Sequence, residues 1–564
     1  MKAIVVAVAG FAVYYLGYLF YSRFIAEKIY ALDADFKTPA HEFQDGTDFV
    51  PTNKHVLWGH HFTSVAGAAP IIGPAIAVYW GWVPALLWVL LGTVFFAGVH
   101  DFGALWISNR HKARSIGALS EAIIGPRSRS LFLIVIFLLL LMVNAVFAIV
   151  IGRLFTAFPG SVIPIWIEVP LAMGVGYWIY KRKGALLWPS IGALVVMYIF
   201  VWFGRSMPVV LPESTLGLPP AAFWVVILFL YTFFSTRLPV WLLLQPRDYI
   251  NSHQLIVALF VLFVGLALGN PDIVAPAFNS NPVGAPSMVP MLFITIACGA
   301  ISGFHGLVAS GTTSKQLNKE TDARFVGYLG AVGEGTLAMG AILAVTAGLA
   351  ATQADWFANF YVDWKAASGG GVKFFVQGVA NLATNMGIPV EVGQVFASVV
   401  VVSFAATTMD TGVRLQRYIV GEVGEIWGIK QLRNPSLATA VAIGACLLLA
   451  FGAQAPTGGV GTGGLTIWPL FGTTNQLLAG LTLIVISVYL RRKGRATWPT
   501  LLPMAFLLFM TIWAMQGAVR KWLFGEAPNY VLGVIGVVVL LSAVWMAVEA
   551  YLAYHNAKQP KAEG

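Results

Sequence analysis

Long apolar runs recur along the whole chain, and they constrain its fold more than any other feature. A bilayer core requires about 20 predominantly apolar residues for each spanning helix. Charged residues make up only 10% of the 564 residues and hydrophobic residues 58%, whereas a soluble protein typically carries about 25% charged residues. These values exclude a soluble multidomain enzyme, a coiled coil and a disordered chain. We therefore expect an all-α polytopic membrane protein.

The apolar runs predict 15 transmembrane helices, joined by loops too short to hold a soluble domain. The expected spans are 3–22, 56–80, 83–107, 131–158, 162–180, 185–204, 222–244, 252–270, 289–312, 324–351, 393–420, 436–454, 466–490, 497–516 and 530–553. No small-residue cleavage site follows the first run, so we expect a helix there and not a cleaved signal peptide.

The basic residues predict the orientation of these spans. With the N-terminus outside, the cytoplasmic segments hold 26 Lys and Arg residues. The outer segments hold six, namely Lys2, Arg205, Lys365, Lys373, Arg520 and Lys521. This asymmetry follows the positive-inside rule. It places the C-terminus in the cytoplasm, and it attributes the net charge of +10 to membrane topology and not to nucleic-acid binding.

The order of the spans suggests an inverted repeat inside one transmembrane domain. Five spans in 56–204 and five in 222–420 begin in opposite directions, as in many secondary transporters with a leucine-transporter-like fold. The segments 1–55 and 436–564 would add an N-terminal helix with its loop and extra C-terminal helices. In such repeats the first helix of each half is interrupted near the middle of the membrane.

Proline and glycine mark the expected interruptions. The first helix contains Gly67, Ala68, Ala69, Pro70 and Gly73, and its counterpart at 222–244 contains Arg237 and Pro239. Proline lacks a backbone N–H and clashes with the preceding turn. The alternative is an ordinary proline kink in each helix. We prefer a substrate site between the two breaks, because freed backbone groups are tolerated only against protein or a water-filled cavity.

Ionisable residues inside the expected spans form the second group of candidates. His60 and His61 should face His100 and Asp101 at equal depth, with His305, Glu334 and Asp410 in the same half of the membrane. Histidine and carboxylates can relay protons, which favours a proton-coupling cluster over a hydrogen-bonded structural plug. A zinc site at His60, His61, His100 and Asp101 is a further alternative, although no HxxxH or HExxH pattern is present.

Three further features involve polar residues within or beside the spans. Arg153 and Glu168 flank one turn and are expected to form a gate or, preferably, a structural ion pair, while Asp410 and Arg414 have the spacing of a helical ion pair. The span 289–312 and its end carry Ser302, His305, Ser310 and Thr312. We expect Ser302 and His305 to contact substrate, and Ser310 and Thr312 to contact a coupling ion, which is either sodium or a proton.

Several long motifs resemble the carbon starvation protein A family of bacterial inner-membrane transporters. They are WGHHFTSVAGAAPIIGP (58–74), VHDF (99–102), LQPRDYIN (244–251), SGFHGLVASGTT (302–313), FAATTMDTGVRLQRY (404–418) and WPLFGTTNQLLAG (468–480). The resemblance implies kinship with the amino acid–polyamine–organocation superfamily. It also implies uptake of peptides or pyruvate during carbon starvation, with protons as the coupling ion.

We therefore expect a secondary active transporter without cofactors, with a proton preferred to sodium as the coupling ion. No GxxxxGK[ST] motif for ATP binding is present. Its partners would be a small-molecule substrate and the lipid bilayer. The alternatives are a channel or nutrient sensor on the same scaffold and an intramembrane zinc enzyme. The sequence leaves the substrate and the oligomeric state open.

Overall fold

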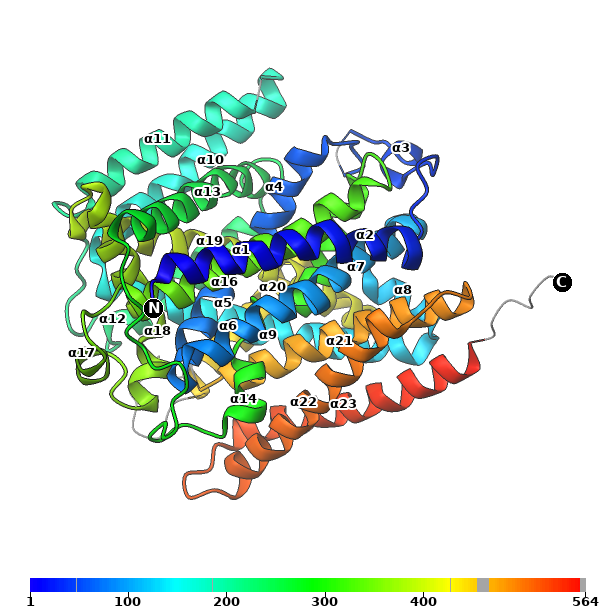
Figure 1. Cartoon of the computed structure of the whole chain (residues 1–564). Coiled ribbons are helices and arrows are strands. Elements are labelled where there is room, and N and C mark those ends of the chain that lie inside the picture. Colours follow the sequence, from blue (N-terminus) through cyan, green and yellow to red (C-terminus); the bar gives the residue numbers. More distant parts are fainter. Residues whose placement is uncertain (47, 185, 427, 454–465, 558–564) are drawn as a thin grey trace.

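A bundle of long helices makes up the protein. The computed structural model describes residues 1–46, 48–184, 186–426, 428–453 and 466–557. The only extended pairings within these ranges are three isolated β-bridges. Figure 1 shows the long helices lying side by side along a common direction, with the start of α1 at one end of the bundle and the last turn of α23 at the other. The expectation of an all-α protein is confirmed.

The helices of the first half of the chain are α1 (Ala3–Leu16), α2 (Ser22–Phe24), α3 (Pro39–Glu42), α4 (Lys54–Val65), α5 (Ala69–Ala77), α6 (Trp82–Gly92), α7 (Gly98–Arg110), α8 (Ile116–Ile123), α9 (Pro126–Ala157), α10 (Val162–Arg182), α11 (Leu187–Gly204), α12 (Pro220–Ser235) and α13 (Leu244–Gly269). Wider π-type turns join α1 to α2 and α6 to α7, so that each pair forms one continuous helix.

The helices of the second half are α14 (Met288–Thr295), α15 (Gly303–Gly311), α16 (Leu329–Ala347), α17 (Gln353–Asn359), α18 (Trp364–Ala383), α19 (Val390–Ile426), α20 (Pro435–Gly452), α21 (Trp468–Arg492), α22 (Trp498–Phe524) and α23 (Tyr530–Asn556). Parts of the expected C-terminal region 436–564, at 454–465 and 558–564, lie outside the described residues.

Twelve helices are long and apolar enough to cross a membrane, or 13 when the bent pair α4–α5 is taken as one span. The two remaining predicted spans, 222–244 and 289–312, contain a 16-residue helix and two short helices respectively. A multi-pass membrane protein is therefore confirmed, but the predicted number of 15 spanning helices is not established.

Large apolar side chains cover the outside of the bundle. Trp188 is 73% exposed, Leu448 77% and Leu502 63%. In Figure 1 the hairpin of α10 and α11 and the hairpin of α22 and α23 lie at opposite edges of the molecule. Contiguous apolar surface of this kind requires contact with lipid or another apolar partner, which agrees with the composition of the chain.

The first leading helix is broken, as predicted. α4 ends at Val65, α5 begins at Ala69, and the two helices meet at an angle of 54°. Pro70 cannot donate a backbone hydrogen bond to the preceding turn. The N–H groups of Ile71 and Ile72 both donate to the carbonyl oxygen of Ala68, so no backbone N–H of a described residue donates to the carbonyl groups of Ala66 and Gly67. The interruption therefore exposes backbone acceptors inside the bundle.

The second break does not lie where the sequence analysis placed it. α12 is regular and ends at Ser235, and Arg237 and Pro239 lie beyond it in an exposed turn. The proline thus follows the end of a helix and interrupts none. Instead, the predicted span 289–312 is split into α14 and α15 by the non-helical residues 296–302. The inverted repeat stays a prediction, and its second half does not start with a broken helix at 222–244.

The two broken helices lie against each other. A Cβ atom at Gly73 in α5 would lie 2.3 Å from the carbonyl oxygen of Thr295, the last residue of α14. A Cβ atom at Gly299, between α14 and α15, would lie 3.5 Å from Cβ of Pro70. Close packing of two backbones requires glycine at such positions. Both interruptions therefore share one region of the protein interior.

Candidate functional site

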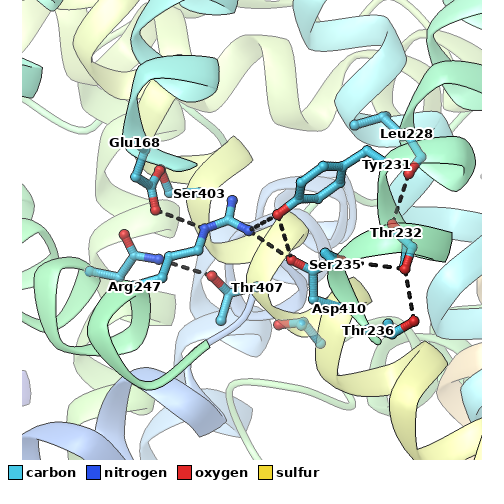
Figure 2. A network of polar contacts seen from close by, with 12 residues as sticks. Glu168, Leu228, Tyr231, Thr232, Ser235, Thr236, Arg247, Ser403, Thr407 and Asp410 are labelled. Carbon is cyan, nitrogen blue, oxygen red and sulfur yellow. Dashed lines mark hydrogen bonds and ion pairs between the residues drawn. The ribbon is translucent and has the colours of Figure 1, made fainter. Parts of the chain in front are cut away.

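A buried arginine joins three helices. Arg247 lies in the first turn of α13 and is 1% exposed. Its Nε donates a hydrogen bond to Glu168 Oε1 in α10 at 2.9 Å, and its Nη1 donates to Asp410 Oδ2 in α19 at 2.8 Å. Figure 2 shows the guanidinium group between these two carboxylates. One cation thus compensates two buried acids.

Hydroxyl groups complete this arginine network. Tyr231 in α12 accepts a hydrogen bond from Arg247 Nη1 at 3.1 Å and donates one to Asp410 Oδ2 at 3.0 Å. Ser235 donates to Asp410 Oδ1 at 2.6 Å, and Ser403 donates to Glu168 Oε2 at 2.8 Å (Figure 2). All four carboxylate oxygens therefore accept at least one hydrogen bond, which is the condition for keeping such charges buried.

Two predicted ion pairs are replaced by this network. Glu168 does not pair with Arg153, because its two oxygens bind Arg247 and Ser403. Asp410 does not pair with Arg414, which donates to the carbonyl oxygens of Ser235 and Leu238 at 3.3 and 2.9 Å. The sequence pattern therefore identified two carboxylates that do pair with a cation. That cation is Arg247 of α13 and not the predicted partners Arg153 and Arg414.

A second polar cluster, the histidine–carboxylate cluster, lies where α7, α15 and α16 meet. Asp101 Oδ2 accepts a hydrogen bond from His305 Nδ1 at 2.7 Å, and Asp101 Oδ1 accepts one from His100 Nδ1 at 2.7 Å. The other ring nitrogen of His305, Nε2, is 3.3 Å from Glu334 Oε1. All four side chains are buried, with exposed fractions of 0 or 1%.

This cluster is incompletely hydrogen bonded. Among the described residues, both carboxylate oxygens of Glu334 and the Nε2 atoms of His100 and His305 lack a partner with hydrogen-bond geometry. Buried polar atoms are normally satisfied. Atoms left open in a membrane interior mark a place where a proton, a water molecule or a substrate group can bind.

The other predicted members of the cluster make different contacts. His61 is fully buried and its Nδ1 contacts Thr313 Oγ1 at 2.9 Å. Its ring lies against α16, since a Cβ atom at Gly330 would be 2.5 Å from Cδ2 of His61. His60 is partly exposed, and Asp410 belongs to the arginine network. Of the predicted members, Asp410 therefore lies in a different network from His100, Asp101, His305 and Glu334.

The segment between α14 and α15 is held by an asparagine from α21. Asn475 Oδ1 accepts a hydrogen bond from the backbone N–H of Phe304 at 3.1 Å, in the first turn of α15. Its Nδ2 contacts Ser302 Oγ and Cys298 Sγ, both at 3.1 Å. Ser302 therefore lies at this break, and its hydroxyl group is engaged by Asn475.

Backbone carbonyl groups remain open on both breaks. In the described part of the chain, the carbonyl oxygens of Cys298, Ala300 and Ile301 accept no hydrogen bond. Those of Ala66 and Gly67 are also open, and a Cβ atom at Gly67 would lie 3.1 Å from Thr408 Oγ1 in α19. Such oxygens can coordinate a cation or accept a hydrogen bond from a substrate.

Ser310 and Thr312 lie away from the breaks. Ser310 Oγ donates to the carbonyl oxygen of Gly306 at 2.6 Å and accepts from the backbone N–H of Ile116 at 2.9 Å, which ties α15 to α8. Thr312 is exposed at the end of α15. The structure does not bring these two hydroxyl groups together with Ser302 and His305.

The zinc alternative depends on a group of several close ligands. His60 is not among the contacts of His100 and Asp101, and no set of three or more His, Cys, Asp or Glu side chains in the described ranges has an arrangement that could hold a metal ion. His100, Asp101, His305 and Glu334 instead form the chain of contacts given above.

Arg247 and Asn475 are the important residues that the sequence analysis did not single out. Both lie in motifs that carry the family resemblance, LQPRDYIN and WPLFGTTNQLLAG. The predicted spans 222–244 and 252–270 leave Arg247 in the loop between them, but α13 starts at Leu244. Asn475, an uncharged polar residue in an apolar span, gives a weaker signal than a charge.

Among solved structures, the fold is similar to that of a manganese transporter of Eremococcus coleocola, with a TM-score of 0.45, 13% identity and 91% of this chain and 99% of that chain covered. It is also similar to MhsT in complex with L-phenylalanine, with a TM-score of 0.42, 14% identity and 87% and 99% of the two chains covered.

Sequence relatives are much closer. The chain is 33% identical to the peptide transporter CstA of Campylobacter jejuni over 96% of its own length and 83% of that protein, and 32% identical to the peptide transporter CstA of Bacillus subtilis over 96% and 95%. It is 31% identical to the pyruvate/proton symporter BtsT of Escherichia coli over 91% and 81%. The profile of the family described as "Carbon starvation protein CstA" matches residues 2–360 and 350–514. The chain therefore belongs to the carbon starvation protein family.

Proposed function

We propose that this chain is a secondary active transporter that imports pyruvate or peptides together with protons by alternating access. Relatives over nearly the whole chain are named peptide transporters and a pyruvate/proton symporter. We place it in the bacterial inner membrane with the N-terminus outside and the C-terminus in the cytoplasm, following the distribution of Lys and Arg. Transport of this kind requires neither a cofactor nor a catalytic residue.

The adjacency of the two broken helices is the observation that carries this proposal. Non-helical backbone inside a membrane is tolerated only where it faces protein or a water-filled cavity, and transporters bind their cargo at such interruptions. Here the break at Ala66–Ala68 and the break at 296–302 meet through Gly73, Thr295, Gly299 and Pro70. At both breaks, some carbonyl groups accept no backbone hydrogen bond from the described residues.

We place the substrate between these breaks. Gly67, Ala68, Ala69, Pro70 and Gly73 contribute backbone, and Ser302 and His305 contribute side chains from the opposite segment. Arg237 and Pro239 are no longer part of this site, because both are exposed in the turn after α12. We take α14–α15 as the counterpart of α4–α5, so that the second half of the inverted repeat begins near Met288.

The histidine–carboxylate cluster is the proposed proton site. His305 belongs to the helix that follows the second break and contacts both Asp101 and Glu334. Binding of a proton in this cluster changes the net charge at His305. His305 lies in the first turn of α15, directly after the break where we place the substrate. The cluster thus offers a physical link between protonation and the position of α15, and this supports a proton over sodium as the coupling ion.

Uptake into proteoliposomes tests the proposal. With an inside-alkaline pH gradient, we expect concentrative uptake of radiolabelled pyruvate or dipeptide, and competition between the two identifies the substrate. Uptake that ignored the pH gradient, or that did not saturate with substrate, would argue against a proton symporter and for a channel.

A glycine variant tests the contact between the breaks. Gly73→Ala places a methyl group 2.3 Å from the carbonyl oxygen of Thr295, so it must force the two broken helices apart. We expect transport to be lost while the protein still purifies as a folded bundle. Gly174→Ala in α10 is the matched control, because a Cβ atom there meets nothing within 4 Å, and it should transport normally.

A further inference from the structure

A large cavity opens at the end of the bundle that carries the N-terminus. Its volume is about 990 Å³, and α14, α18, α21 and α22 contribute to its walls. Backbone hydrogen bonds tie this end together: Ala3 N–H donates to Pro271 O and Trp82 N–H donates to Pro276 O, both in the loop after α13. Trp364, which lines the cavity, donates to Val283 O in the same loop.

Cations dominate the charged residues of this cavity. Lys365, Arg520, Lys521 and Arg153 line it. A smaller adjoining pocket of about 200 Å³ shares Arg153 and adds Lys373. Among the described residues that line the two spaces, none is Asp or Glu. Among the described lining residues, Lys365, Lys373, Arg520 and Lys521 therefore face no acidic side chain.

These cations are unusual for their side of the membrane. The sequence assigns only six basic residues to the outer segments, and four of them, Lys365, Lys373, Arg520 and Lys521, line the cavity or its side pocket. The other two, Lys2 and Arg205, do not. Outer segments normally carry few Lys and Arg residues, so their concentration around one opening calls for a local reason.

The cavity leads towards the proposed substrate site. Its lining includes Ile76 of α5 and Thr295, the last residue of α14 before the second break. Thr295 is also the residue that Gly73 contacts. A solute inside the cavity thus reaches the place where the two broken helices meet.

We propose that this cavity is an outer vestibule that gathers substrates with a net negative charge, and that the transported species is therefore an anionic carboxylate, such as pyruvate or an acidic peptide. A cleft lined by charges of one sign focuses the field and raises the local concentration of the oppositely charged solute. The inference rests on the proposed transport function, because it specifies which carboxylates that site receives.

Neutralising two vestibule cations tests this inference by transport. In Arg520→Gln/Lys521→Gln the KM for pyruvate should rise about four-fold at low ionic strength, since each charge at about 10 Å changes local concentration about two-fold. The maximal rate should be unchanged, and the difference should shrink at high salt. The matched control is Lys2→Gln/Arg205→Gln, which removes two outer cations that do not line the cavity and should leave KM unchanged.

Fluorescence quenching tests the vestibule without transport. Trp364, Trp468, Trp513 and Trp522 line the cavity, so iodide attracted into it should quench their fluorescence. We expect weaker iodide quenching in the Arg520→Gln/Lys521→Gln variant than in wild type, and equal quenching by neutral acrylamide. The Arg520→Lys/Lys521→Arg variant, which keeps both charges, should behave like wild type.

The outcomes separate the vestibule from the transport function. Iodide quenching that is the same in the neutralised variant and in wild type overturns the vestibule, as does an equal rise of KM in the Lys2/Arg205 control. Normal charge-dependent iodide quenching in a protein that transports neither pyruvate nor peptides would support the vestibule and reject the proposed function.

Discussion

Two buried charged networks, only a few helices apart, differ in how their polar atoms are satisfied. In the arginine network, Glu168 and Asp410 share the guanidinium group of Arg247, and hydroxyl groups occupy their remaining oxygens. In the histidine–carboxylate cluster, Glu334 makes one contact of 3.3 Å to His305 and otherwise lacks partners among the described residues. The carboxylate oxygens of the arginine network thus all accept hydrogen bonds, whereas those of Glu334 accept none with good geometry from the described residues.

The difference indicates different roles. A guanidinium group keeps its proton under all ordinary conditions, and three helices held by such a group are fixed relative to each other. Histidine and carboxyl side chains can pass protons to one another inside a membrane, and unsatisfied polar atoms provide a place to bind a proton. We therefore propose a structural role for the arginine network and proton coupling for the histidine–carboxylate cluster.

The largest expected effect follows removal of the shared cation. Arg247→Met leaves Glu168 and Asp410 buried without a counter-charge, and breaking a buried pair in this way costs about 3–5 kcal/mol. We expect poor yield of monodisperse protein and a strongly lowered thermal midpoint in detergent. The triple variant Arg247→Met/Glu168→Gln/Asp410→Asn removes all three charges and should recover much of that stability. A single variant as stable as wild type would contradict the structural role.

Neutralising a carboxylate of the histidine–carboxylate cluster should weaken the coupling of transport to protons and leave folding largely intact. Asp101→Asn and Glu334→Gln keep the size of each side chain but remove its charge. We expect each to lower uptake driven by a pH gradient about ten-fold, in the range typical of coupling free energies, while substrate exchange at equal pH continues. Loss of exchange together with normal gradient-driven uptake is the opposite pattern, and it would remove the cluster from the coupling mechanism.

A variant of Asp248 tests which of the two networks binds the coupling proton. It follows Arg247 and is 5% exposed, and its Oδ1 has no hydrogen-bond partner in the described part of the chain. If the histidine–carboxylate cluster binds the coupling proton, Asp248→Asn should change the pH dependence of uptake little. The variant should also be as stable as wild type or slightly more stable, because burying a carboxylate without hydrogen-bond partners costs free energy. If uptake by this variant no longer depended on the pH gradient, the coupling proton would bind next to Arg247 and not in the histidine–carboxylate cluster.

The smallest effect is expected for Arg237, which the sequence pattern predicted to lie at the substrate site. Arg237 is exposed, and its guanidinium carbon lies 5.6 Å from the ring centroid of Phe233. Arg237→Gln should change the free energy of unfolding by no more than about 0.5 kcal/mol and should leave the KM for substrate unchanged. A raised KM in this variant would restore Arg237 as a substrate ligand.

Some of the site was predictable because its signal is local. The break at Ala66–Ala68 follows from the chemistry of the nearby proline, Pro70, within one segment. The grouping of His100, Asp101, His305 and Glu334 follows from the cost of burying ionisable groups in a membrane, which forces them to meet. Asp410 was placed in the wrong group because depth along a helix does not determine which neighbour a side chain faces.

The apolar runs by themselves determined that the chain is an all-α, multi-pass membrane protein, since lipid imposes a fixed length and composition on each spanning helix. The contacts of the charged residues were decided only by tertiary structure. Arg247 and Arg237 are ten positions apart, yet one joins α10, α13 and α19 and the other lies in an exposed turn. Helix boundaries and the lateral packing of helices set that difference, and neither is encoded in hydropathy, which reports only depth in the membrane.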